Sequence, residues 1–426
     1  MPKAVKVKRY KNIYKRRTPL SILLRVVCIV VVVGLLGFIG WSAYEPVRAY
    51  LDSIAFEWKN NPTPSLPEIP DISASPEPEA PAPESLPELP PEPAVSASEP
   101  APAESEPAAP EGSEIPSGTQ LRGAYLPVSD LLDPNLLAAR LSDFQEAGYT
   151  AVLIDLKDAN GSLLYRSKRG RIPLEEGVTP YDLSAACEQI RAAGMLPIGR
   201  MHTFRDYTAA LSDNNMAVQY LDTREHWLDN SREKGGKPWL NPYSEQARAY
   251  LVGLAEEAVS MGVEQILLDS VMFPVGVRLD AATYGETGDV SRSEVLSAFV
   301  RQVSSAVSAK GGTVSLIVRA ADVFSNPDSL GGDPLVLSDQ ITLNLSPAVL
   351  GENFSAGGFT VEHPMQDPGD TVQRMLDALS GRLPGQFTAL IQDPNNSTAM
   401  VQAVQEVLKE NGVESYLIVQ ESPNPN

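Results

Sequence analysis

Eight strand-like runs, most of them followed by a helix-like stretch, fill the sequence between residues 121 and 419. Strands are predicted at 121–128, 151–155, 196–202, 265–269, 314–318, 340–345, 387–392 and 415–419. Short, continuous apolar runs of this kind are typical of strands that are buried on both faces. Eight strands in about 300 residues predict an α/β fold of the (β/α)8 TIM-like barrel type, and an open doubly wound sheet is the alternative.

Helical patterns separate most of these strands. They lie at 134–147, 182–193, 244–261, 291–310, 370–379 and 397–411. A glycine such as Gly194 or Gly262 closes several of them just before the next apolar run, as expected of the left-handed residue that ends a helix. Between the fifth and seventh strands the helical patterns are short or absent.

Charge divides the chain into distinct parts. Residues 1–18 hold eight basic side chains and no acid, whereas residues 60–118 hold twelve acids and no base. The whole chain carries a net charge of −20, which leaves −16 for residues 119–426. Nucleic-acid-binding domains need a basic face, so no nucleic acid partner is expected. Anionic lipid and acidic wall polymers would be repelled, and a neutral or cationic ligand suits this domain better.

The N-terminal region indicates a membrane anchor. Residues 21–41 are apolar except for Arg25, and their length matches the roughly 20 residues that a bilayer requires. We expect a basic cytoplasmic tail at 1–18, one transmembrane helix in the lipid bilayer at 19–44, and a C-terminal domain on the extracellular side of the cell membrane. A cleaved signal peptide is the alternative, although its apolar core usually has only about 7–15 residues.

Residues 45–118 are predicted to be a disordered stalk that precedes a globular domain at 119–422. The larger part, 60–118, is almost wholly Pro, Glu, Ala and Ser, and such a composition cannot bury a hydrophobic core. Proline and like charges keep the segment extended, so it acts as a semi-rigid spacer. Cys28 and Cys187 lie on different sides of this stalk, and no disulfide is expected.

Polar side chains gather at or just after the predicted strand ends, where a barrel carries its chemistry. They include Asp155, Lys157, Asp158, Arg200, His202, Asp206, Asp269, Arg319, Asp322, Asn344 and Gln392. A ring of carboxylates suits glycoside hydrolysis, because one acid protonates the leaving oxygen and a second attacks carbon or activates water. We expect Asp269 to be the nucleophile or base and Asp322 its catalytic partner. The structural alternative is that these acids cap helices or pair with Lys and Arg.

Other chemistries lack a sequence signal. The three histidines, His202, His226 and His363, have no metal-ligand spacing, so no metal site is expected. A serine nucleophile elbow and a phosphate-binding loop are both absent from the sequence, and no cofactor is expected. The segment 206–241 is long for a loop and contains Trp227 and Trp239, which predicts either a wall of a binding site or a small packed subdomain.

Four sequence motifs follow one another along the domain. They are 151–161 (AVLIDLKDANG), 199–206 (GRMHTFRD), 236–243 (GKPWLNPY) and 268–274 (LDSVMFP). Together they resemble the "putative glycosyl hydrolase domain" family of bacterial envelope proteins, a barrel family that is distantly similar to the α-amylase group. The resemblance implies a sugar site lined by the strand-end residues above, and it adds Trp239 and Asn241 as substrate contacts.

Two departures from the family follow the acid of the fourth strand. Ser270 and Met272 stand where the family has Tyr and Arg, and an arginine there would orient Asp269 and lower its pKa. The later family motif, rich in aromatic residues and His, is reduced to 344–347 (NLSP).

The sequence therefore predicts a membrane-anchored, extracytoplasmic glycoside-hydrolase-like protein that acts on or binds cell-envelope polysaccharide, and it leaves enzymatic activity open. Alternatives are a non-catalytic module that binds a glycan or a partner protein, and a polysaccharide deacetylase, which would need clustered metal ligands.

Overall fold

The computed structural model describes residues 120–169 and 179–420. The predicted cytoplasmic tail at 1–18, transmembrane helix at 19–44 and stalk at 45–118 lie outside these residues. Within the described ranges, no helix has both the length and the apolar character that crossing a bilayer would take.

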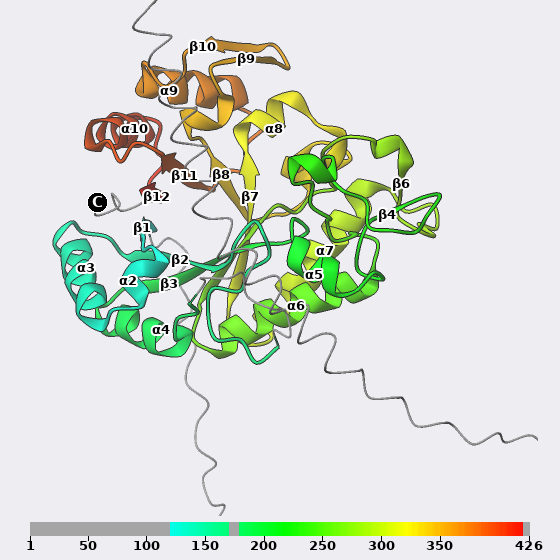
Figure 1. Cartoon of the computed structure of the whole chain (residues 1–426). Coiled ribbons are helices and arrows are strands. Elements are labelled where there is room, and N and C mark those ends of the chain that lie inside the picture. The colour runs from blue at the N-terminus through cyan, green and yellow to red at the C-terminus, as the bar shows by residue number, and fades with distance from the viewer. Residues whose placement is uncertain (1–119, 170–178, 421–426) are drawn as a thin grey trace, which may run out of the picture. The chain divides into compact units, whose positions relative to one another are not determined.

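Eight parallel strands close into a barrel (Figure 1), as predicted, and an open sheet is excluded. Around the barrel the order is β1, β12, β11, β8, β7, β5, β3, β2 and back to β1. The strands are β1 (Arg122–Tyr125), β2 (Ala151–Lys157), β3 (Leu196–His202), β5 (Gln265–Asp269), β7 (Thr313–Arg319), β8 (Ile341–Asn344), β11 (Thr388–Asp393) and β12 (Tyr416–Gln420). All eight lie within a few residues of the predicted runs.

The strands are mostly apolar up to their carboxyl ends because both of their faces are buried. Along β2, Leu153 points into the barrel and joins an interior cluster with Ile198 of β3 and Leu267 of β5. Its neighbours Val152 and Ile154 point outward and join the larger core beneath the helices. This alternation follows the two-residue period of a strand.

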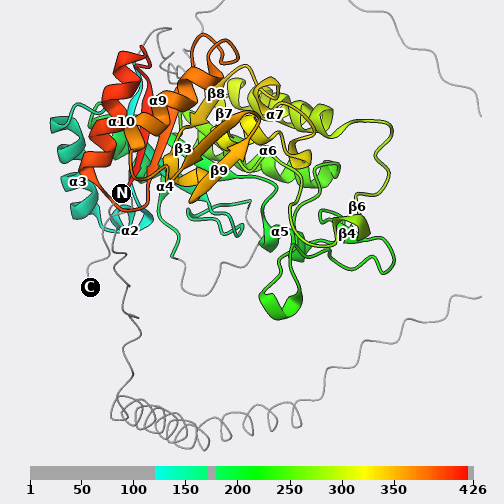
Figure 2. The same ribbon diagram turned by 90° about the horizontal axis from the view of Figure 1, so that it is seen from above.

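Helices cover the outside of the barrel, as Figures 1 and 2 show from two directions. Their bounds are α2 (Val128–Leu131), α3 (Pro134–Glu146), α4 (Leu183–Ala192), α5 (Tyr207–Ser212), α6 (Glu245–Ser260), α7 (Arg292–Ser308), α8 (Ala320–Ser325), α9 (Pro368–Leu379) and α10 (Thr398–Glu410). Polar residues cap the start of most of them: Asp182 caps α4, and Ser291 forms a capping box with Glu294 at the start of α7. All six predicted helices are confirmed.

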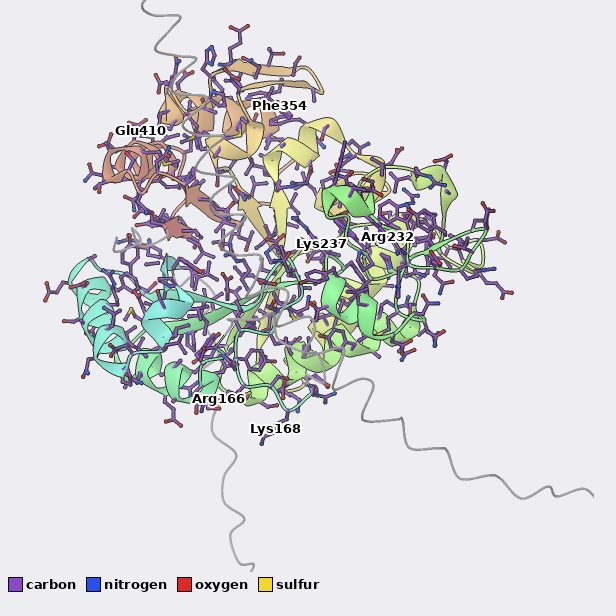
Figure 3. The ribbon with its side chains drawn as sticks, in the orientation of Figure 1. Arg166, Lys168, Arg232, Lys237, Phe354 and Glu410 are labelled. Carbon is purple, nitrogen blue, oxygen red and sulfur yellow. The ribbon has the colours of Figure 1, made fainter. Side chains whose placement is uncertain are left out.

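The connections between β7 and β11 differ from the rest of the barrel. A short helix, α8, links β7 to β8, and a hairpin of β9 (Asn353–Ala356) and β10 (Phe359–Glu362) precedes α9. Phe359 of this hairpin stacks on Phe324 of α8 with ring centroids 4.4 Å apart, and Phe354 (labelled in Figure 3) packs at its edge. These contacts stabilise the part of the barrel where the helical patterns are weakest.

The loops after β3 and β5 join in a side lobe. Its strands β4 (Gln219–Tyr220) and β6 (Ala282–Thr283) pair antiparallel and stand away from the barrel in Figure 2. Trp227 and Trp239 are buried here against Val218. Lys237 of the lobe (Figure 3) donates a hydrogen bond to Asn160, in the loop after β2, over 2.6 Å. The segment is therefore packed as a small subdomain, and its Trp239 also lines a cavity at the barrel.

Candidate active site at the barrel mouth

A cavity of about 430 Å³ opens at the carboxyl ends of β3, β5, β7, β8 and β11. Its lining includes His202, Arg205, Asp229, Trp239, Asp269, Ser270, Met272, Arg319, Asp322, Asn344 and Gln392. Ile317, which belongs to the barrel interior, forms part of its floor. The volume falls in the range of roughly 300–1,000 Å³ that is usual for small-molecule sites.

Strand register brings the predicted residues onto one rim. Asp155 of β2 lies beside Arg200 of β3, and His202 of β3 lies beside Asp269 of β5. Two hydrogen bonds fix the second pair, since the backbone N–H of Thr203 (2.8 Å) and its hydroxyl (2.9 Å) both donate to the backbone carbonyl of Asp269. The ends of β3 and β5 are therefore held together at the mouth.

The Asp269 carboxylate is partly exposed, with 26% of its side chain accessible. Its Oδ1 accepts a hydrogen bond from the Ser270 hydroxyl at 3.2 Å and lies 3.7 Å from Nδ1 of His202. Burial pushes the pKa of Asp269 upward, but the neighbouring His202 and Arg200 and the hydrogen bonds from Ser270 outweigh burial, so this pKa lies below its ordinary value. Asp269 is therefore an anion at neutral pH.

His202 has the opposite balance. Burial lowers the pKa of its imidazole, and the positive charges of Arg200 and Lys157 act in the same direction. The attraction of Asp269 and Asp155 only partly offsets them, so the pKa lies below its ordinary value. The ring is neutral at neutral pH, with Nδ1 hydrogen-bonded to the Ser270 hydroxyl over 2.9 Å.

A second cluster surrounds Asp155. Arg200 donates two hydrogen bonds to its carboxylate, from Nε at 2.6 Å and from a terminal nitrogen at 2.9 Å, and the Tyr125 hydroxyl donates a third at 2.9 Å. The guanidinium also lies over the Tyr125 ring, 5.6 Å from its centroid. Burial lowers the pKa of Arg200, but the charge and hydrogen bonds of Asp155 raise it more. Neither Asp155 nor Arg200 lines the cavity. They lie on the adjacent strands β2 and β3, next to its His202 side.

Asp322 lies in the first turn of α8 and lines the same cavity as Asp269. Arg319 holds it with two hydrogen bonds, from Nε at 2.6 Å and from a terminal nitrogen at 2.9 Å. Both carboxylate oxygens act as acceptors in this arrangement. Asp269 therefore differs from Asp155 and Asp322, since among the described residues no arginine or lysine lies within ion-pair distance of it.

Three of the predicted site residues hold the loops beneath the rim. Lys157 and Asp206 pair at 2.8 Å and are both fully buried, and Asp206 also caps α5 through the N–H of Ala209. Asp158 accepts hydrogen bonds from the N–H groups of Asn160 and Ser162, which closes the turn after β2. None of these three side chains lines the cavity.

The remaining predicted residues divide between the cavity and the lobe. Asn344 of β8 donates to Gln392 of β11 over 3.1 Å and accepts hydrogen bonds from Ser346, so two amides face the cavity as a connected pair. Trp239 lines the cavity and donates to Asp229 over 3.1 Å. Asn241 lies elsewhere, bound to the backbone of Tyr243 and Tyr284 in the lobe.

The sequence analysis missed three residues at the mouth. Ser270 was noted only as a departure from the family, yet it is the hydrogen-bond partner of both His202 and Asp269. Arg205 and Asp229 also line the cavity, together with the expected strand-end residue Arg319. Position after a strand end could have identified Arg205, whereas Asp229 belongs to the side lobe and has no local sequence signal.

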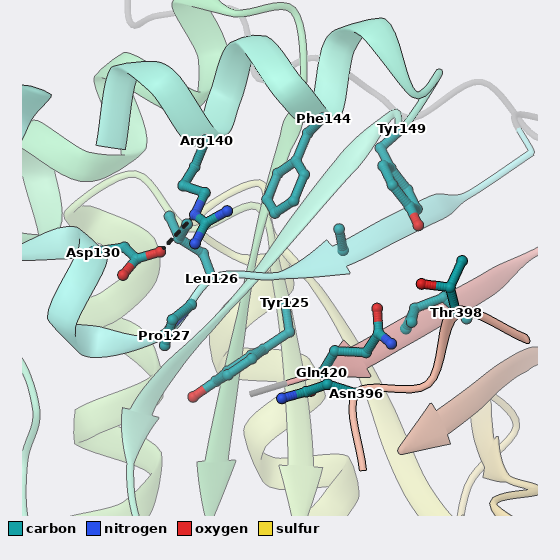
Figure 4. Close-up of a pocket in the computed structure, with 12 residues that line it drawn as sticks. Tyr125, Leu126, Pro127, Asp130, Arg140, Phe144, Tyr149, Asn396, Thr398 and Gln420 are labelled. Atoms are coloured by element: carbon teal, nitrogen blue, oxygen red, sulfur yellow. Dashed lines mark hydrogen bonds and ion pairs between the residues drawn. The ribbon is translucent and has the colours of Figure 1, made fainter. Parts of the chain in front are cut away.

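A smaller hollow of about 220 Å³ lies beside the mouth, between β1, α3 and the start of α10. Figure 4 shows Tyr125, Asn396 and Gln420 on one side of it and the ion pair of Asp130 and Arg140 on another. It contains none of the predicted site residues. In the part of the chain that the structure describes, no group of three His, Cys, Asp or Glu side chains is arranged to hold a metal ion.

A family model described as "Putative glycosyl hydrolase domain" matches residues 123–413. The glycoside hydrolase domain of PgaB (BpsB) from Bordetella bronchiseptica has a similar structure, with a TM-score of 0.51, 13% identity, and coverage of 72% of this chain and 94% of that domain. A hypothetical protein from Ruminiclostridium thermocellum matches with a TM-score of 0.38 at 23% identity, over 45% of this chain and 96% of its own. No curated protein matches the chain. The similarity to the Bordetella bronchiseptica domain agrees with the barrel fold.

Proposed function

Because the chain belongs to the family described as "Putative glycosyl hydrolase domain", we propose that its barrel mouth binds a glycan and hydrolyses a glycosidic bond, with Asp269 as the reactive carboxylate. Family membership implies a carbohydrate-related function, and the similar domain from Bordetella bronchiseptica is itself a glycoside hydrolase domain. The reaction, the substrate and the residue roles belong to the proposal.

One observation carries the proposal: of the two cavity acids that follow barrel strands, Asp269 and Asp322, only Asp322 is paired with an arginine among the described residues. An ionised carboxylate that is oriented by hydrogen bonds suits the role of nucleophile or base, and not the role of proton donor. His202 and Ser270 orient it in place of the arginine that Met272 replaces. Arg200 and Arg319 do not take over that task, because each already binds another acid.

Asp322 is the proposed partner of Asp269. It lines the same cavity, and 15% of its side chain is exposed. To donate a proton to a leaving oxygen, it must release at least one of its two hydrogen bonds from Arg319, whose own side chain is 48% exposed and able to move. A bound sugar hydroxyl that accepts a hydrogen bond from Arg319 would permit this release.

The charges of the cavity favour a neutral or cationic glycan. Asp322 and Arg319 neutralise each other, which leaves the carboxylates of Asp229 and Asp269 against the guanidinium of Arg205. A cleft with an excess of charge of one sign favours ligands of the other sign or of none. The overall charge of −20 acts in the same direction at longer range.

We also propose that the domain lies at the cell envelope, where it acts on or binds the envelope polysaccharide. The support is the sequence alone: an apolar segment at 19–44 after a basic tail, and an acidic, proline-rich stalk at 45–118. Protease treatment of intact cells tests this placement. Degradation of the globular domain with protection of the N-terminal tail is expected, and a domain that is cleaved only after lysis would overturn the proposal.

A non-catalytic glycan-binding module is the second candidate. The observation in its favour is that two of the strand-end carboxylates, Asp155 and Asp322, are occupied by arginine. One experiment separates the two functions: the purified full-length chain is incubated with a panel of envelope glycans, and bound glycan and new reducing ends are measured together. Binding with new reducing ends supports hydrolysis, and binding alone supports the non-catalytic module. If no glycan of the panel is bound or cleaved, both functions are contradicted.

A further inference from the structure

The hydroxyl of Ser270 lies between the two central groups of the mouth. Its Oγ is 2.9 Å from Nδ1 of His202 and 3.2 Å from Oδ1 of Asp269, whereas those two atoms are 3.7 Å apart, beyond direct hydrogen bonding. Among the described residues, the hydrogen-bonded connection between the imidazole and the carboxylate therefore passes through Ser270.

Proton counting decides the direction of this connection. A serine hydroxyl has one proton to donate, and the Asp269 carboxylate, which is ionised, can only accept. If Ser270 donates to Asp269, its oxygen lone pair faces Nδ1, and Nδ1 must carry the proton of the neutral ring. If Nδ1 were unprotonated, Ser270 would donate to it, and the lone pairs of Oγ would face Oδ1 of Asp269 without a proton between the two oxygens. The first arrangement satisfies all three atoms.

We propose that Ser270 is a positioning residue that holds His202 as the Nδ1–H tautomer, leaving Nε2 as an unprotonated acceptor for a hydroxyl group of the ligand or for the attacking water. His202 lines the cavity, and within the described ranges Nε2 has no hydrogen-bond partner. The chain of donors runs from Nδ1–H of His202 to Oγ of Ser270 and from its O–H to Oδ1 of Asp269. The ligand class assigned to Nε2 rests on the proposed function, whereas the tautomer does not.

The backbone supports this geometry on both sides. Ser270 has a φ of +56°, in the left-handed region that is unfavourable for a residue with a side chain. Lys157 donates to the backbone carbonyl of His202 over 2.6 Å, and Thr203 donates twice to that of Asp269. A residue with a strained backbone, such as Ser270 beside these hydrogen-bonded strand ends, is typical of a site where the direction of the side chain matters.

The charged groups around the ring keep it neutral. Asp269 from β5 and Asp155 from β2 favour a protonated ring, while Arg200 from β3, Lys157 from β2 and burial oppose it. Burial and the two cations outweigh the two carboxylates, so the imidazole of His202 carries a single proton at neutral pH. That proton lies either on Nδ1 or on Nε2.

Nitrogen NMR of the full-length chain with ¹⁵N-labelled histidine tests the proposal directly. The chain has three histidines, so His202→Gln identifies the signals of His202, and His226 and His363 serve as internal references. At about pH 8, above the ordinary histidine pKa of about 6.5, the two tautomers give different ¹⁵N shifts. The expected result is that His202 carries its proton on Nδ1; a proton on Nε2 overturns the proposal.

The variant Ser270→Gly tests the role of the hydroxyl. Glycine adopts a positive φ without strain, so the fold is retained while both hydrogen bonds are lost. The Nδ1–H form of His202 should become the minor tautomer in this variant, while Ser260→Ala, which alters an exposed serine of α6, leaves it unchanged. An unchanged tautomer in Ser270→Gly would show that Asp269 orients the ring without Ser270. Because no glycan is needed, failure here is distinct from failure of the proposed hydrolysis.

Discussion

The ammonium group of Lys157 lies 2.8 Å from the carboxylate of Asp206, and neither side chain is accessible to solvent. The pair joins the end of β2 to the first turn of α5, since Asp206 also accepts a hydrogen bond from the N–H of Ala209. Gly161 packs against it so closely that a Cβ atom at that position would lie 1.9 Å from Oδ1 of Asp206. The loops after β2 and β3 are thus locked under the rim of the mouth.

Removal of one partner should therefore be costly. Lys157→Met leaves the Asp206 carboxylate buried without its counter-charge, and the free energy of unfolding should fall by about 3–5 kcal/mol. The double variant Lys157→Met with Asp206→Asn, which removes both charges and keeps the helix cap, should recover a large part of the loss. Urea unfolding followed by tryptophan fluorescence measures both changes. A loss below about 1 kcal/mol in the single variant would show that the pair does not stabilise the fold.

Ser270→Gly should leave thermal stability unchanged or raise it, while ligand binding or turnover falls. Glycine removes the strain of a positive φ, which offsets the two lost hydrogen bonds and the extra freedom of the unfolded chain. Ser270→Ala loses the same hydrogen bonds and keeps the strain, so its melting temperature should be the lower of the two. Calorimetry on both variants checks this order. The reverse order would mean that φ at this position carries no strain.

The low pKa of His202 predicts a specific pH dependence of stability. Burial is the main cause of the shift, and the unfolded chain takes up the proton near the ordinary value of about 6.5. Between that value and the lower pKa of the folded state, the unfolded state binds more protons, so the free energy of unfolding falls as the pH falls. His202→Gln should flatten this part of the curve, whereas His363→Gln, at an exposed position, should not. Urea midpoints at pH values from about 7 to 5 measure the slopes; equal slopes in wild type and His202→Gln would contradict the assignment.

The fold could be predicted from the sequence because its signals are local. Buried parallel strands require continuous apolar runs, and helix ends require capping residues such as Asp182 and Gly194, so all eight barrel strands were located to within a few residues. The hairpin of β9 and β10 was not predicted, since its exposed, alternating residues resemble a loop. The pairing of β4 with β6 joins residues more than 60 positions apart and leaves no local pattern.

The site could be predicted only in outline. Position at a strand end was enough to place Asp155, His202 and Asp269 on one rim. Which partner each group takes depends on the rim as a whole: Lys157 turns inward to Asp206, and Arg200 turns to Asp155 and not to Asp269. The function of Ser270 could not be inferred from its type alone, because it depends on a left-handed φ that brings the hydroxyl to His202.

The role of Asp269 is tested most directly by one comparison on whichever glycan the full-length chain cleaves. Initial rates of reducing-end release are measured for the wild type, for Asp269→Asn, and for Asp339→Asn, an exposed acid that precedes β8 at the opposite end of the barrel. Asp269→Asn should lose at least about 100-fold in rate with an unchanged melting temperature, as expected when a group that takes part in the chemistry is neutralised, while Asp339→Asn keeps the wild-type rate. Equal rates in wild type and Asp269→Asn would contradict the assignment of the reaction to the mouth of the barrel.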